Sequence, residues 1–169
     1  MAIVFIGFQQ SGKTTLGRYL ANKTQQSFID LDEHIVNHSP YHSIQEAYLK
    51  LGEEQFREHE HQSLRYAQQH DLAIIATGGG SITTHKNQKL IKEIGGVIYL
   101  KWSFDQLQNK IVKPAYLKTP SLETCFNERV PLYEDLAETT LHLDNHSSIV
   151  SVASLILNHH LQHIISPND

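Results

Sequence analysis

Apolar residues along the chain gather in short continuous runs, and the longer stretches between the runs show helical periodicity. Continuous apolar runs of strand length are typical of parallel strands that are buried on both faces. The runs lie at residues 3–6, 27–32, 72–77, 97–100 and 139–143. The helical stretches lie at residues 15–20, 33–37, 43–51, 53–69, 84–93, 103–112, 123–137 and 148–165. This alternation predicts an α/β fold, in which a parallel sheet is covered by helices on both faces.

Glycine and proline divide these stretches. Gly52 separates two helical stretches, and Pro131 predicts a break or kink in the stretch that contains it. Two glycines at residues 95–96 are expected to end another helix. Residues from 114 to about 122 contain two prolines and little periodicity, which is typical of a mobile loop. The length of 169 residues suits a single domain, residues 1–169, with a full core.

The strongest motif follows the first apolar run. Residues 7–14 read Gly-Phe-Gln-Gln-Ser-Gly-Lys-Thr and open onto a predicted helix, which is the strand, loop and helix order of a phosphate-binding P-loop. The glycines allow backbone N–H groups to converge on one anion, and the helix N-terminus adds its dipole. In such loops the amine of a lysine like Lys13 reaches β- and γ-phosphate oxygens, and a hydroxyl like that of Thr14 binds Mg²⁺. The motif predicts that the chain binds a nucleoside triphosphate.

Two further motifs follow the ends of predicted strands. Asp30 and Asp32 end the second run, where strand alternation places them on the same face. Asp30 is expected to hold Mg²⁺ through water, and Asp32 to accept or orient the hydroxyl of an acceptor; alternatively, both carboxylates only cap the next helix. Residues 78–80 are three glycines, which form either a simple turn or a loop whose backbone N–H groups approach a ligand. Because parallel strands share one carboxyl edge, these motifs are expected to meet the P-loop there.

Arginine is scarce in this chain, which contains four: Arg18, Arg57, Arg65 and Arg129. Glu60 follows Arg57 by three residues, lies on the same helix face and is placed to steer it. Two guanidinium groups near this edge of the sheet would clamp a substrate carboxylate. Solvated helix charges are the ordinary alternative, and the spacing does not decide between the two.

Composition and net charge limit the kinds of molecule that the chain is expected to bind and the compartment that suits it. The chain carries 14 Lys and Arg against 18 Asp and Glu, a net charge of −4, which argues against a protein that grips nucleic acid. A single cysteine, Cys125, forms no internal disulfide and suits a reducing compartment. The N-terminal apolar run is too short to span a membrane. A cytoplasmic protein with no membrane or nucleic-acid partner is therefore expected.

Taken together, the motifs resemble those of the shikimate kinase family. The matching pieces, in family order, are GFQQSGKTTLGRYLA, FIDLDEHI, SIQEAYLKLGEEQFREHE, IIATGGGS and ERVPLYEDLAE, and they extend from residue 3 to about residue 145. The resemblance implies a P-loop kinase fold of the nucleoside-monophosphate-kinase type, a three-layer α/β/α domain with a five-stranded parallel sheet and a mobile lid at about residues 111–122. It also implies transfer of the ATP γ-phosphate to the 3-hydroxyl of shikimate, a step towards chorismate and the aromatic amino acids, by a monomer that uses Mg²⁺.

The resemblance further assigns roles to individual residues. Asp32 binds the shikimate hydroxyls and is the general base, while Arg57 and Arg129 grip the shikimate carboxylate. The phosphates are held by Lys13 and the rest of its loop, namely Gln10, Ser11, Gly12, Thr14 and Thr15. Thr14 also ligates Mg²⁺, with Asp30 behind it. The backbone amides offered to the substrate are those of Gly78, Gly79 and Gly80.

The chain departs from the family pattern at the lid, where an arginine followed by proline is usual. The matching residues here are Val112, Lys113 and Pro114, and we expect Lys113 to act as the lid cation. Lysine supplies positive charge without the bidentate fork of arginine, so weaker stabilisation of the transition state is expected.

Two other functions fit part of the pattern. A kinase for another small hydroxy acid, such as gluconate, would keep the P-loop and a carboxylate grip but would not need the FxDxD and triple-glycine motifs together. A nucleotide-binding regulator that has lost catalysis is supported only by the absent lid arginine. The retention of Lys13 and Asp32, with both candidate arginines, argues against such a regulator.

Overall fold

The computed structural model describes residues 2–111 and 121–160, except for the side chains of residues 159 and 160. Within these residues, five parallel strands form one sheet in the order β2-β3-β1-β4-β5. The strands are β1 (Ala2–Ile6), β2 (Phe28–Asp30), β3 (Ile74–Ala76), β4 (Gly95–Lys101) and β5 (Thr139–His142). The helices are α1 (Lys13–Thr24), α2 (Leu31–Asn37), α3 (Ile44–Gln69), the 3-10 turn η1 (Ser81–Thr83), α4 (His85–Ile94), α5 (Phe104–Gln108), α6 (Leu122–Leu136) and α7 (Ile149–His160). The predicted α/β fold with a five-stranded parallel sheet is confirmed.

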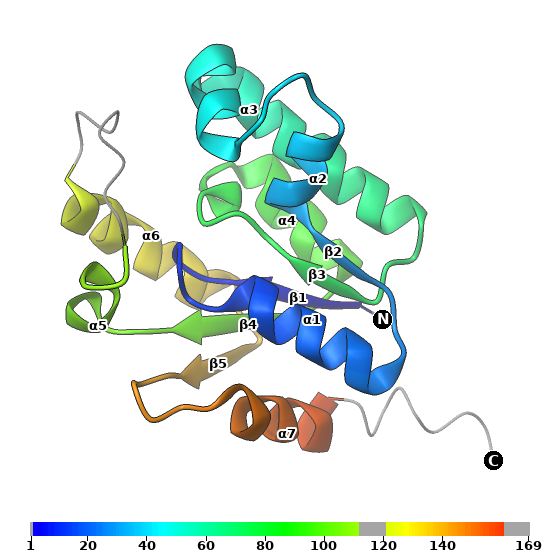
Figure 1. Cartoon of the computed structure of the whole chain (residues 1–169), viewed down its shortest axis with the longest axis vertical. Coiled ribbons are helices and arrows are strands. Elements are labelled where there is room, and N and C mark those ends of the chain that lie inside the picture. Colours follow the sequence, from blue (N-terminus) through cyan, green and yellow to red (C-terminus); the bar gives the residue numbers. More distant parts are fainter. Residues whose placement is uncertain (1, 112–120, 161–169) are drawn as a thin grey trace.

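Helices cover both faces of the sheet (Figure 1). Alternation along the central strand β1 divides its side chains between two cores. Val4 and Ile6 pack with residues of α3, α4 and α6 on one face, whereas Ile3 and Phe5 pack with residues of α1 and α7 on the other. All four side chains are buried. The run is continuously apolar because neither face of this strand meets solvent.

A smaller apolar cluster joins α2 to the first part of α3. Its buried members are Ile35, Ala47 and Phe56. Figure 1 shows this pair of helices at the top of the view, beside the edge of the sheet that carries β2. The cluster therefore places the start of α2 and the middle of α3 next to the carboxyl ends of β2 and β3.

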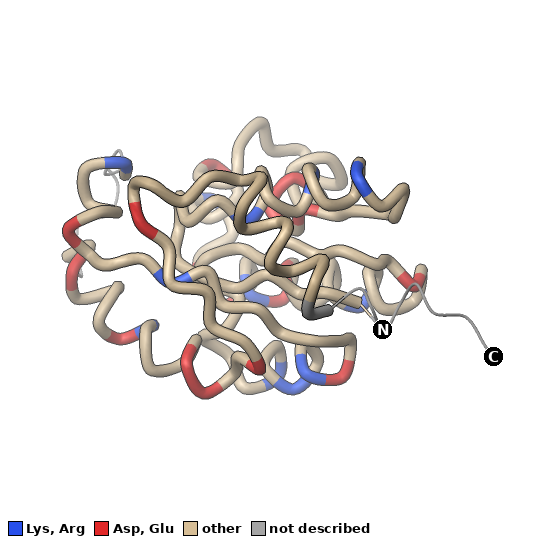
Figure 2. Tube along the Cα trace, turned by 90° about the horizontal axis from the view of Figure 1, so that it is seen from below, with Lys and Arg blue, Asp and Glu red and all other residues tan. Residues whose placement is uncertain are grey.

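Charged side chains of both signs are interspersed along the described chain (Figure 2). Several form surface ion pairs, such as Lys86 with Glu58 and Lys101 with Glu134. Exposed pairs of this kind contribute little to stability. Among the described residues, no helix combines the length and apolar character that crossing a bilayer requires.

The prediction that residues 27–32 form one strand is wrong at its carboxyl end. Strand β2 stops at Asp30, and Asp32 lies in the first turn of α2. The reason is capping: the Asp30 Oδ1 atom accepts a hydrogen bond from the Glu33 backbone N–H at 3.1 Å, which satisfies a donor at the helix start. Asp30 and Asp32 therefore reach the same edge of the sheet from two different elements, not from one strand face.

Glycine or proline was predicted to interrupt or end a helix at three positions, and the structure shows a different outcome at each. Gly52, with a φ of +75°, interrupts α3 as predicted and turns one stretch into two helical segments. Of the break or kink predicted at Pro131, the break does not occur, because α6 continues through this residue. The carbonyl that proline cannot pair belongs to Asn127, which is exposed and can therefore pair with water. Gly95 both follows α4 and begins β4, where it pairs with Ala2 of the neighbouring strand. Glycine is required there because a Cβ atom would lie 2.0 Å from the carbonyl oxygen of Ala2.

The predicted lid lies mostly outside the described residues. Helix α5 ends at Gln108, four residues earlier than the predicted end at residue 112, and α6 begins at Leu122. Residues 112–120, which include Lys113, belong to the part of the chain that the structure does not describe. The assignment of Lys113 stays a prediction.

Candidate active site

The P-loop connects the carboxyl end of β1 to α1, at the centre of the sheet (Figure 1). The Lys13 side chain lies inside the loop, where its amine donates to the carbonyl oxygens of Gly7 and Phe8 at 2.8 Å each. Burial lowers the pKa of Lys13 to about 8, against the opposing effect of the nearby Asp32 and Asp30 carboxylates. The loop thus holds one buried cation at its centre, as a phosphate site requires.

Thr14 and Asp30 lie together beside this loop. The Thr14 hydroxyl donates to Asp30 Oδ2 at 2.5 Å, while the other carboxylate oxygen caps α2. Asp30 therefore caps α2 with one carboxylate oxygen and contacts Thr14 with the other. A hydroxyl that donates its proton to a carboxylate keeps its oxygen lone pairs available for a cation. The pair fits Mg²⁺, which binds through one or two protein oxygens and keeps several waters.

Asp32 lies against the triple-glycine loop. A Cβ atom on Gly78 would be 2.5 Å from Asp32 Oδ1 and 2.9 Å from Glu60 Oε1. Burial and, to a smaller extent, the Asp30 and Glu60 carboxylates raise the pKa of Asp32 to about 7, against the lowering effect of Lys13 and Arg57. A carboxyl group with a pKa near 7 is suited to accept a proton at neutral pH.

Arg57 is not a solvated helix charge. Its side chain is 10% exposed, and its Nη1 atom donates to Glu60 Oε2 at 2.8 Å. Burial opposes the positive charge, but the Glu60 carboxylate outweighs this effect and raises the pKa of Arg57. A Cβ atom on Gly80 would lie 2.6 Å from both terminal nitrogens of the guanidinium. Its Nε atom is buried and has no hydrogen-bond partner among the described residues.

Glu60 joins Arg57 to the loop after β3. Its side chain is 1% exposed, and its Oε1 atom accepts from the Ser81 hydroxyl at 2.7 Å. The sequence indicated that Glu60 lies near Arg57, but it gave no signal for Ser81. The guanidinium is thereby fixed relative to residues 78–80.

Arg129 approaches the same place from α6. Its guanidinium lies 5.6 Å from the centre of the Phe8 ring. Tyr133 lies one helical turn further along α6, and its hydroxyl donates to the carbonyl oxygen of Gly79. Tyr133 was not among the predicted site residues, although it is the last residue of the Arg-x-Pro-Leu-Tyr motif. The contact ties α6 to the triple-glycine loop.

These groups surround one hollow, which we call the Arg57 hollow. It is lined by Asp32, Arg57, Arg129 and the three glycines, with Tyr48 and Phe56 among its apolar walls. Two guanidinium groups and one carboxylate beside an apolar wall suit a small molecule that carries a carboxylate and hydroxyls. The structure therefore brings together the predicted substrate residues, while Lys113 lies outside the described residues.

A second hollow lies on the other side of the P-loop, and we call it the Trp102 hollow. Its lining includes Gln10, Trp102, Lys110 and residues 147–149, where the chain enters α7. The Trp102 indole donates to the Ser11 carbonyl oxygen at 3.1 Å, and the Lys110 amine lies 3.5 Å from the centre of the indole ring. The sequence analysis predicted Gln10 and Ser11 as site residues but missed Trp102 and Lys110, because a lone tryptophan after a strand gives no signal of a site. The position beside the phosphate loop suits the remainder of a nucleotide.

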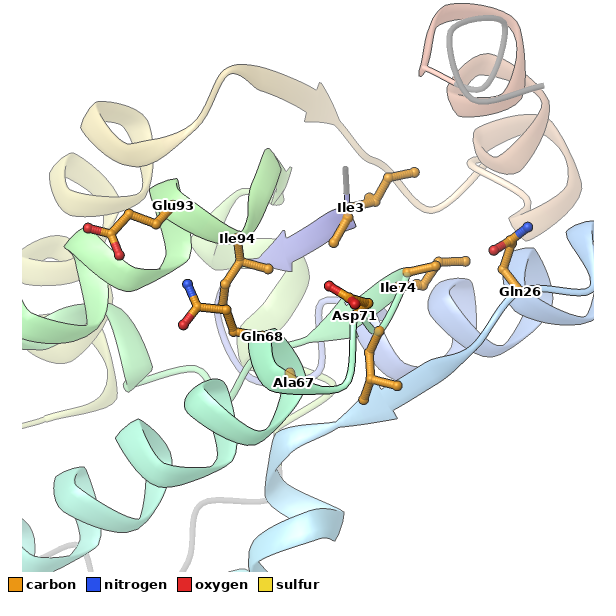
Figure 3. A pocket seen from close by; sticks show the side chains of 11 residues that line it. Ile3, Gln26, Ala67, Gln68, Asp71, Ile74, Glu93 and Ile94 are labelled. Carbon is orange, nitrogen blue, oxygen red and sulfur yellow. The ribbon is translucent and has the colours of Figure 1, made fainter. Parts of the chain in front are cut away.

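Another hollow lies at the amino-terminal edge of the sheet, by the starts of β1 and β3 (Figure 3). Ile3 and Ile74 line it together with Gln68 and the carboxylates Asp71 and Glu93. Among the described residues that line it, none is lysine or arginine. It does not suit a phosphate, and it holds none of the predicted site residues.

A P-loop after the central strand, with hollows on both of its sides, is the arrangement of a P-loop kinase, a class in which ligands bind at the carboxyl edge of the parallel sheet. Within that class, the family model for shikimate kinase matches residues 9–162, and the chain belongs to the shikimate kinase family. The resemblance drawn from the motifs is confirmed.

Individual relatives agree with this assignment. A shikimate kinase from Dictyoglomus turgidum is 35% identical over 153 residues, covering 85% of this chain and 88% of the relative. One from Enterococcus faecalis is 35% identical over 154 residues, covering 86% and 90%. The solved structure of shikimate kinase from Acinetobacter baumannii in complex with shikimate has a TM-score of 0.82 and 29% identity, and the match covers 98% of this chain and 95% of that one.

Proposed function

We propose that this chain transfers the γ-phosphate of ATP to the 3-hydroxyl of shikimate. The observation that carries the proposal is the Arg57 hollow, in which two guanidinium groups and Asp32 surround one space beside the P-loop. Shikimate carries one carboxylate and three hydroxyls on a six-carbon ring, so it offers the groups that these side chains recognise. Family membership supports the same reaction.

The residues divide the work of phosphoryl transfer, which depends mainly on positioning and on neutralising charge. Lys13 and residues 10–15 hold the phosphates of ATP, and Arg57 and Arg129 bind the shikimate carboxylate. Thr14, with Asp30 behind it, would hold Mg²⁺, which would supply positive charge against the phosphates of ATP. The backbone of residues 78–80 positions the acceptor.

Asp32 orients the 3-hydroxyl and accepts its proton. Burial and the neighbouring carboxylates raise the pKa of Asp32 to about 7, close to the pH at which a general base works best. Only the ionised form accepts the proton, so the reaction should require deprotonated Asp32. Lys113 is proposed as the lid cation, and the protein is proposed to act as a cytoplasmic monomer.

The test is ADP release by the purified protein with Mg-ATP, with shikimate or gluconate as the acceptor. We expect release that depends on shikimate, that is not produced by gluconate, and that falls at least a hundredfold in Asp32→Asn. Asp135→Asn, an exposed residue on α6, is the matched control and should retain full activity. Tight ATP binding without release in the presence of shikimate would overturn the proposal.

The role of Lys113 needs a separate variant. Lys113→Ala should lower kcat while leaving the KM for shikimate nearly unchanged, because the lid cation acts on the transferring phosphate. Unchanged turnover in this variant would show that the lid cation is another residue.

A further inference from the structure

Three histidines and one tyrosine form a stack of rings where α2 meets the second part of α3. His34 lies on α2 and His38 follows the end of that helix, whereas Tyr66 lies on α3 and His70 follows its end. Between ring centres, His34 is 4.1 Å from His38 and 4.5 Å from Tyr66, and Tyr66 is 3.9 Å from His70. We call these four residues the histidine stack. The proposed reaction uses none of them.

The hydrogen bonds of His34 suit a neutral imidazole. Its Nδ1 atom pairs with the Ser63 hydroxyl at 3.0 Å, and its Nε2 atom is buried without a hydrogen-bond partner among the described residues. A neutral imidazole carries one N–H donor, whereas the charged ring carries two. Whichever nitrogen holds the proton in the neutral ring, the charged ring therefore has a donor at the buried Nε2 atom. A buried donor without an acceptor is unfavourable.

The groups around His34 also disfavour a positive charge on its ring. Burial and, to a smaller extent, charges on His38 and His70 lower the pKa of His34 from its ordinary value of 6.5. In the described part of the chain no carboxylate acts on this pKa, and the neighbouring Glu33 pairs with an arginine of α1. The Tyr66 ring attracts a single imidazolium. Two or three charged imidazoles at these spacings, however, repel one another.

The histidine stack lies close to the Arg57 hollow along α2. Helix α2 packs against α3 at two places: the apolar cluster of Ile35, Ala47 and Phe56, and the histidine stack (Figure 1). Asp32 lies in the first turn of α2, two residues before His34, and lines the hollow. Because α2 has only seven residues, a displacement of its middle also displaces its first turn.

We propose that the histidine stack is a pH-sensitive contact, which holds α2 and Asp32 in place when its imidazoles are neutral and loosens when they take up protons. Its effect on catalysis rests on the proposed function, in which Asp32 is the base. Since the fold lowers the pKa of His34, the unfolded chain binds more protons than the folded chain between that pKa and 6.5. The stabilisation by this contact is therefore complete above about pH 6.5 and is lost as the pH falls through the pKa of folded His34.

Urea unfolding of the full chain between about pH 7.5 and about pH 5 tests the contact. In His34→Asn, the new side chain keeps a polar atom near the position of Nδ1 but takes up no proton. As the pH falls, the unfolding constant of the wild type divided by that of His34→Asn should rise about five- to hundredfold, the range expected for a buried donor without an acceptor. Asp32 titrates in both proteins, so its contribution cancels in this ratio. His85→Asn, which replaces an exposed histidine at the start of α4, is the matched control, and its ratio should stay within about twofold.

A second variant keeps the test decisive if His34→Asn does not fold. His38→Asn combined with His70→Asn leaves His34 in place and removes both neighbouring charges, at two exposed helix ends where asparagine is tolerated. Its unfolding constant should rise less steeply with falling pH than that of the wild type. Ratios to the wild type that stay within about twofold across the pH range, for both variants, would overturn the inference.

The effect on the hollow is measured by the KM for shikimate over the same pH range. As the pH falls, this KM should rise more in the wild type than in His34→Asn, while the KM for ATP should change equally in both proteins. An equal rise in the KM for shikimate would overturn the connection between the histidine stack and the hollow. The proposed function fails differently: the wild type would then release no shikimate-dependent ADP at about pH 7.5, and the unfolding comparison would still decide whether the contact is pH-sensitive.

Discussion

Replacing Glu60 with glutamine removes the negative charge that holds Arg57 at the base of the Arg57 hollow. The Glu60 side chain is 1% exposed, and each carboxylate oxygen has one partner: Oε2 accepts from Arg57 at 2.8 Å and Oε1 from Ser81 at 2.7 Å. Glutamine keeps the shape of the side chain, but its NH₂ group cannot accept either hydrogen bond. The variant therefore leaves a largely buried guanidinium without its main counter-ion.

The expected loss of stability is large. Removing one partner of a buried ion pair costs roughly 3–5 kcal/mol, because the remaining charge stays desolvated. The other carboxylate that forms an ion pair with Arg57 belongs to Glu53, which is 3.6 Å away and 67% exposed, so water screens most of its effect. Since domains of this size are stable by about 5–15 kcal/mol, Glu60→Gln should lose a substantial fraction of the free energy of unfolding.

Urea unfolding of Glu60→Gln and of Glu58→Gln provides the measurement. Glu58 lies two residues earlier on α3 and pairs with Lys86, but both side chains of that pair are 50% exposed. Its variant should lose less than about 1 kcal/mol. Shikimate binding should also weaken in Glu60→Gln alone, since Arg57 loses its alignment. Equal unfolding midpoints for the two variants would refute this reasoning.

Three further changes test the site. Tyr133→Phe removes the contact with the Gly79 carbonyl and should raise the KM for shikimate about tenfold while the KM for ATP stays constant; an equal rise in both constants would contradict this. The pH profile of kcat/KM should rise up to about pH 7, where Asp32 ionises, and fall above about pH 8, where Lys13 loses its proton; a flat profile between pH 5 and 9 would argue against both roles. Gly80→Ala places a methyl group 2.6 Å from a guanidinium and should weaken shikimate binding, as calorimetry would show; wild-type affinity would mean that the guanidinium moves aside freely.

The sequence predicted the sheet well because local pattern and tertiary burial agree there. Each central strand is apolar on both faces, as Val4 and Phe5 illustrate on β1, and no other element of this fold produces so short and continuous a run. The P-loop was equally clear, since its residues are contiguous. The prediction that Asp32 belongs to the strand failed for a physical reason. Alternating apolar and acidic residues occur at the end of a strand and also at the start of a capped helix. Only the hydrogen bond from the backbone of Glu33 distinguishes them.

The contacts between distant residues could not be predicted from spacing. Whether Arg57 was solvated or buried depended on Glu60 and on a loop more than twenty residues further along the chain. The same holds for Trp102, which follows the neighbouring strand β4 and whose indole donates to a P-loop carbonyl from a position that no motif marks. Such pairings follow from how β3 and β4 are placed beside β1, and that placement is a property of the folded sheet.

The sequence marked the triple-glycine loop as a motif, but it did not show why each of the three positions requires glycine. The sequence indicated that these glycines present backbone N–H groups to a ligand. The structure adds that a side chain on Gly78 would collide with Asp32, and one on Gly80 with Arg57, while Gly79 approaches the backbone of Gln9 in the P-loop. The loop therefore brings the candidate base, the candidate carboxylate clamp and the phosphate loop within reach of one another, and a side chain at any of the three positions would push them apart.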